Sequence, residues 1–149
     1  MQYEFSGQMS SARVILYHKQ STSAMTRFFK LNDGGVLIGG EIPKLARVIT
    51  GEVKDDPSVV SHPAAIVAEL AAWLGLSVDA FEVETEYAEL LEVPGELIRM
   101  NLIRFTTIDP PFAEAEQVGA SFIALTQARG LESVELELLR SAYTMIMEG

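Results

Sequence analysis

The chain has 149 residues and no cysteine, and its 21 acidic residues outnumber 11 Lys and Arg, which gives a formal net charge of −10. This length suits one domain, so we expect a single domain over residues 1–149. The absence of cysteine excludes disulfides, thiolate metal sites and cysteine nucleophiles. The negative charge argues against nucleic acid and anionic membranes as partners.

The N-terminal residues lack the basic and apolar parts of a signal peptide. No apolar run approaches the roughly 18–20 residues that a membrane span needs. We therefore expect a cytoplasmic protein with no membrane partner.

The charge is distributed unevenly along the chain. Residues 1–54 hold seven Lys or Arg and four Asp or Glu, whereas residues 55–149 hold four and seventeen. We favour the interpretation that the two parts are complementary halves of one fold or simply solvated faces. Alternatively, a basic surface meets an acidic one across a subunit contact.

The first forty residues have the composition of strands separated by short polar turns. Residues 13–19 and 25–32 are rich in β-branched and aromatic side chains, and Asn-Asp-Gly-Gly at 32–35 is typical of a tight hairpin. We expect strands over residues 2–8, 13–19, 25–32 and 36–42. A short helix is expected to begin at Pro43 and to end before Gly51.

A longer helix is predicted over residues 61–74, with Ser61 as its N-cap and Gly75 as its end. Large apolar residues recur along one side at helical spacing. Alanines make the remaining surface small and mildly apolar, so we expect this helix to be well covered or to form part of an interface.

Residues 81–91 alternate apolar and acidic side chains, which predicts a strand with one buried face. Glu82, Glu84 and Glu86 share the other face, at a spacing that allows a hard cation. No calcium-loop pattern accompanies them, so a solvated face is the better interpretation. A Pro-Gly turn then leads to a strand over 97–107, and this pairing places Arg99 within reach of Glu92.

The C-terminal part predicts two helices, the first over residues 109–129 and the second from about residue 133 onward. Strands and helices thus occur in separate runs. This order favours an α+β fold. We expect an antiparallel sheet of about five or six strands with the helices packed mainly on one face.

The sequence offers no catalytic, nucleotide or metal motif. The two histidines, His18 and His62, lack ligand spacing, so we expect no metal and no cofactor. His62 is the better placed of the two for general-base chemistry. The glycine pairs at 34–35 and 39–40 match neither phosphate-binding pattern. Basic and aromatic residues mingle in the first half of the chain, but no nucleic-acid signature accompanies them.

Two functional hypotheses remain, and neither settles whether the protein is an enzyme. The preferred one is a non-catalytic module that binds another protein or itself. Its support is the alanine-rich helix and the opposite charge of the two halves. The alternative is a small-molecule-binding protein or an enzyme, with a site between sheet and helices. The ligand-binding candidates for that site are His62, Tyr87, Arg99 and Arg104.

Overall fold

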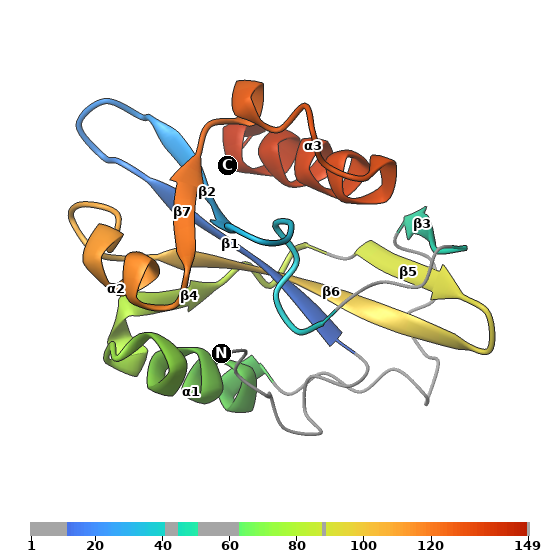
Figure 1. Ribbon diagram of the computed structural model, residues 1–149, viewed down its shortest axis with the longest axis horizontal. Coiled ribbons are helices and arrows are strands. Elements are labelled where there is room, and N and C mark those ends of the chain that lie inside the picture. Colours follow the sequence, from blue (N-terminus) through green and yellow to red (C-terminus); the bar gives the residue numbers. More distant parts are fainter. Residues whose placement is uncertain (1–11, 41–44, 51–62, 88, 149) are drawn as a thin grey trace.

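The computed structural model describes residues 12–40, 45–50, 63–87 and 89–148, and Figure 1 shows how the elements are arranged. The strands are β1 (Ala12–Lys19), β2 (Thr26–Leu31), β3 (Arg47–Thr50), β4 (Phe81–Val83), β5 (Glu89–Val93), β6 (Glu96–Phe105) and β7 (Ala120–Ile123). The helices are α1 (Pro63–Leu74), α2 (Phe112–Gln117) and α3 (Ser133–Glu148). In these ranges no helix is long and apolar enough to cross a membrane. The predicted strand over 2–8 and the predicted N-cap Ser61 lie outside the described residues.

The described strands form one mixed sheet of seven, in the order β3-β5-β6-β1-β2-β7, with β4 also paired to β6. All pairings are antiparallel except that of β1 with β6, which runs parallel from Ala12↔Arg99 to Tyr17↔Arg104. The α+β class is confirmed, but the expectation of a purely antiparallel sheet is wrong. The long connection between β1 and β6, which includes α1, lets β6 return beside β1 in the same direction.

Two separate apolar clusters cover the two faces of the sheet, because successive strand residues point to opposite sides. In β1, Leu16 packs in a cluster with α1, whereas Ile15 packs in a cluster with α3. Figure 1 shows α1 and α3 on opposite sides of the sheet. The expectation that the helices pack mainly on one face is therefore wrong. The unbroken apolar run of β1 is typical of a strand that is buried on both faces.

The predicted hairpin between residues 81–91 and 97–107 is present, but its first strand is divided. β4 ends at Val83 and a turn separates it from β5. β5 and β6 then pair through a two-residue turn of Pro94 and Gly95, with Val93 opposite Glu96. Gly95 has a φ of 89°, which explains why glycine occupies this position.

The register of this hairpin corrects one predicted ion pair. Glu92 lies opposite Leu97 rather than Arg99. Its partner is Arg47 on β3, with Nη2 of Arg47 2.7 Å from Oε1 of Glu92. Both side chains are well exposed, so the pair contributes only about 0–1 kcal/mol to stability.

Two predicted elements in the first part of the chain differ from the structure. Within the described part of the expected strand over 36–42, residues 36–40, the pairing is a single bridge between Val14 and Ile38, and residues 41 and 42 lie outside the described residues. The expected short helix begins at Pro43, which lies outside the described residues, and its described end before Gly51 is instead β3, which pairs with β5. Three residues of the expected helix fit a helical spacing by coincidence. The edge of β5 is available for pairing, and it favours the extended conformation for β-branched Val48 and Ile49.

The predicted helix over 109–129 is also wrong. α2 has only six residues and ends where Gly119 adopts a φ of 76°. The next residues form β7, which pairs with β2 and places Phe122 opposite Phe29. Tertiary contact with an existing strand edge thus overrides the helical pattern.

Candidate functional site

The four side chains predicted to bind a ligand are not brought together by the fold. His62 lies outside the described residues. Arg99 and Arg104 are both on β6, but an odd number of residues apart, so they point to opposite faces of the sheet. Tyr87 lies between β4 and β5 and contacts α3. The three described candidates therefore occupy three different environments.

The side chain of Tyr87 already contacts other groups of the protein. Its ring is 4% exposed, and its hydroxyl lies 3.1 Å from Oγ of Ser141 and 3.4 Å from the carbonyl oxygen of Leu138. Burial raises the pKa of Tyr87 above its ordinary value. This side chain joins the segment between β4 and β5 to α3, which is a structural role.

Arg104 lies in a polar cluster on the α3 face. Its register partner in β1 is Tyr17, whose hydroxyl donates to Oε1 of Glu84 at 2.8 Å. Nη2 of Arg104 lies 3.5 Å from the carbonyl oxygen of Lys19, whereas its buried Nε has no hydrogen-bond partner among the described residues. Burial and the hydrogen bond to Glu84 raise the pKa of Tyr17, and the charge of Arg104 opposes them.

A stability profile at alkaline pH tests this cluster. The fold favours the neutral phenol of Tyr17, so its contribution is complete below the unfolded pKa of about 10 and is lost as the pH rises above it. We expect the Tyr17→Phe variant to lose stability less steeply above that pH, by up to about 1.4 kcal/mol per pH unit. Urea unfolding at a series of pH values measures this slope. Equal slopes for both proteins would show that Tyr17 ionises equally in the folded and unfolded chains.

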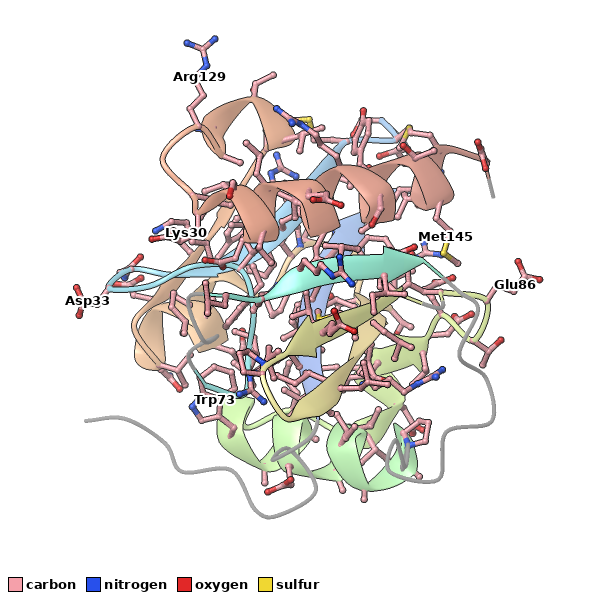
Figure 2. The ribbon with its side chains drawn as sticks, turned by 90° about the vertical axis from the view of Figure 1, so that its right-hand side faces the viewer. Lys30, Asp33, Trp73, Glu86, Arg129 and Met145 are labelled. Atoms are coloured by element: carbon pink, nitrogen blue, oxygen red, sulfur yellow. The ribbon has the colours of Figure 1, made fainter. Side chains whose placement is uncertain are left out.

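The three glutamates predicted to share a strand face are separated. Glu82 is exposed on β4, Glu84 accepts the hydrogen bond from Tyr17, and Glu86 follows in the turn. Glu86 projects away from the rest of the molecule in Figure 2. Among the described residues no group of three or more acidic or histidine side chains could hold a metal ion.

His18 is fully buried at the end of β1. Its Nε2 lies 2.7 Å from the carbonyl oxygen of Thr107. Because a carbonyl only accepts, Nε2 carries the proton. This bond joins the segment after β6 to β1.

Phe28 and Phe29 are also inaccessible. Both are fully buried, Phe28 in the α3 cluster and Phe29 in the α1 cluster. The aromatic part of the basic and aromatic segment is therefore core, and these two rings are not available to stack on bases.

Arg99 points to the α1 face of β6, where Leu97 and Asn101 are its same-face neighbours along the strand. Asn101 is 6% exposed. Nε of Arg99 and Nδ2 of Asn101 are buried, and neither atom has a hydrogen-bond partner within the part of the chain that the structure describes. Asn101 was missed in the sequence because an isolated Asn in a strand carries no recognisable motif.

A second feature missed in the sequence is an apolar surface at one end of the sheet. Met25, Ile108 and Phe112 are 43%, 87% and 54% exposed, and we call these three residues the loop surface. Met25 precedes β2, Ile108 follows β6, and Phe112 begins α2. Sequence reasoning placed Phe112 on the buried side of a long helix, so its exposure was not expected.

Hydrogen bonds hold the two loops of this surface in place. Nε2 of Gln20 donates to Oδ1 of Asp109 at 2.9 Å, and the amide of Gln20 donates to the carbonyl of Met25 at 3.0 Å. The guanidinium carbon of Arg27 lies 5.9 Å from the centre of the Phe112 ring. These contacts join the loop that carries Met25 to the loop that carries Ile108, and they join β2 to the start of α2.

The packing of the alanine-rich helix α1 agrees in part with the prediction. Its large apolar residues pack in the α1 cluster, whereas Ala64, Ala68 and Ala72 are exposed along the outer side. Methyl groups offer little area to a partner, so this stripe is a weaker docking surface than the loop surface.

Comparison of the chain with protein-family models and with curated proteins finds no match.

Proposed function

We propose that the protein is a non-catalytic assembly module, which associates with a second copy of itself through the loop surface. The observation that carries this proposal is the exposure of Met25, Ile108 and Phe112 on segments at the same end of the sheet, two of which are joined by a hydrogen bond between Gln20 and Asp109. Large apolar and aromatic side chains provide most of the energy of protein association. Fixed loops also lose little conformational entropy on binding.

The charge around this surface supports a second copy as the partner. A chain of net charge −10 repels itself, so a self-contact is favoured where local acidic charge is low. The guanidinium of Arg27 beside Phe112 places a positive charge at this surface, and it offsets the negative charge that Asp109 keeps while it accepts a hydrogen bond from Gln20. An isologous contact would bury the same apolar residues twice and close the assembly as a dimer.

We expect wild-type protein to dimerise with increasing concentration and the Ile108→Asp variant to weaken dimerisation about tenfold or more. The new carboxylate would have to be desolvated in the contact. Sedimentation velocity over a concentration series measures the dimer fraction. Ile108 is so exposed that the substitution should leave the fold unchanged.

Leu45→Asp is the matched control, because Leu45 is 77% exposed and lies just before β3, outside the loop surface. It should dimerise like wild type. A wild-type protein that stays monomeric at every concentration would refute the proposal. So would an Ile108→Asp variant that dimerises as well as the Leu45→Asp control.

The dependence of dimerisation on salt concentration distinguishes this apolar contact from a contact between basic and acidic surfaces. An apolar contact persists or strengthens as salt is added, whereas a charge-driven contact weakens. Dissociation of the dimer at high salt, with Ile108→Asp still dimeric at low salt, would favour the contact between charged halves.

A further inference from the structure

We infer that Met25 is a site of reversible oxidation by hydrogen peroxide, and that the resulting sulfoxide weakens self-association. This inference rests on the proposed function, because it takes the loop surface as the contact between two copies. The reactive group is the thioether of a side chain that this contact would cover. Oxidation of the monomer therefore competes with association.

The distribution of methionines in the structure distinguishes exposed thioethers from protected ones. The chain has six methionines and no cysteine, so a peroxide meets thioethers rather than thiols. Of the described methionines, Met100 is fully buried and Met145 is partly buried, whereas Met25 and Met147 are 43% and 44% exposed. Met25 belongs to the loop surface, whereas Met147 lies on the last turn of α3. The chain thus supplies two methionines of equal exposure in different places.

The turn before β2 fixes the main chain of Met25 and leaves the residue open to solvent. The amide of Gln20 donates to the carbonyl of Met25 at 3.0 Å, and the amide of Met25 donates to Oγ of Ser23 at 3.4 Å. The amide of Ala24 donates to the carbonyl of Gln20 at 2.7 Å, which closes the same turn. These bonds leave the Met25 thioether free of any hydrogen-bonding task, so an oxygen can be added to it without breaking them. The modification can therefore take place on the folded protein.

The reaction converts an apolar side chain into a polar one. The thioether sulfur attacks one oxygen of hydrogen peroxide and forms an S–O bond while the O–O bond breaks. The sulfur gives up an electron pair to the peroxide, and the proton of the transferred oxygen passes to the leaving hydroxide to form water. The new sulfoxide oxygen is an acceptor, which would lose its bonds to water inside an apolar contact. An isologous contact contains Met25 from both copies, so both sides of an oxidised dimer carry this cost.

Association and oxidation are therefore coupled in both directions. A contact that covers Met25 keeps peroxide away from its thioether, and an oxidised Met25 disfavours the contact. We expect Met25 to be oxidised more slowly at protein concentrations at which the dimer dominates. Met147 should react at the same rate in dilute and concentrated samples, because it lies outside the loop surface.

A timed exposure to hydrogen peroxide tests the inference. Peptide mass spectrometry measures the oxidised fraction of each methionine, and sedimentation velocity measures the dimer fraction of the same sample. Oxidised wild-type protein should dimerise about tenfold more weakly than untreated protein, and a methionine sulfoxide reductase should restore dimerisation. Met147→Leu is the matched control, because it removes an equally exposed methionine and should respond to peroxide as wild type does. Met25→Leu should show no loss of dimer relative to its own untreated sample.

The untreated wild-type protein keeps this inference distinct from the proposed function. If it dimerises and keeps its dimer fraction after Met25 is oxidised, self-association stands and the inference is overturned. The inference also fails if peroxide dissociates Met25→Leu as readily as wild type, or if Met25 reacts no faster than buried Met100. Equal oxidation rates of Met25 in dilute and concentrated samples would place Met25 outside the contact and overturn it as well. An untreated protein that never dimerises would refute self-association, and this inference with it.

Discussion

Replacement of Phe29 by alanine is expected to lower the free energy of unfolding by about 3–5 kcal/mol, a large part of the stability of a domain of this size. Phe29 is fully buried on β2 and joins three elements of the α1 face. Its ring centre lies 5.7 Å from that of Trp73 on α1, 6.3 Å from that of Phe105 on β6 and 5.7 Å from that of Phe122 on β7. The alanine variant leaves a cavity that these rings can fill only in part.

Urea unfolding followed by circular dichroism measures this loss. Phe112→Ala is the control, because Phe112 contacts Phe122 at the rim and is 54% exposed. It should cost far less stability than Phe29→Ala. Comparable losses for the two variants would mean that the α1 cluster does not depend on Phe29 as its centre.

The second large effect is expected at Gly35, where alanine should destabilise the protein by about 2–3 kcal/mol. A β-carbon at this position would overlap the carboxylate of Glu135 on α3. That carboxylate accepts the amide of Val36 at 2.8 Å and the amide of Leu37 at 3.4 Å. Hydrogen bonds to a charged group are the stronger kind, so displacing Glu135 costs more than an ordinary contact.

Gly34→Ala is the matched control, because a β-carbon there meets Cβ of Leu31 at 3.5 Å, an ordinary contact. Thermal unfolding should separate the two variants clearly. A double-mutant cycle with Glu135→Ala identifies the cause, since Gly35→Ala should cost much less once the carboxylate is absent. A full additive loss in the double variant would assign the effect to the backbone of Gly35 rather than to Glu135.

Elements with a strong local pattern could be predicted from the sequence. β1, β2, α1 and α3 agree with their predicted ranges within a few residues, and the hairpin between β5 and β6 has its predicted turn. In each case the apolar spacing and the terminating residues point to the same element. Where the local pattern is weak, contacts between distant parts of the chain determine which element forms. β7 exists because β2 offers it an edge, and no local signal around Phe122 reveals this.

The candidate site was less predictable than the fold. Arg99 and Arg104 were identified as polar groups near the sheet, but their assignment to opposite faces depends on the strand register. Asn101 stands out only because it is buried and its Nδ2 has no hydrogen-bond partner among the described residues. The exposure of Ile108 follows from the early end of β6 and the short length of α2, neither of which was predicted.

The parallel pairing of β1 with β6 has a consequence for biosynthesis. β1 is made early, but about half of the chain separates it from its partner β6, so an unpaired apolar strand edge leaves the ribosome well before β6 emerges. Pairings between such distant segments also close slowly. The nascent chain is therefore exposed to aggregation during synthesis, and a holding chaperone would have its greatest value before β6 has left the exit tunnel.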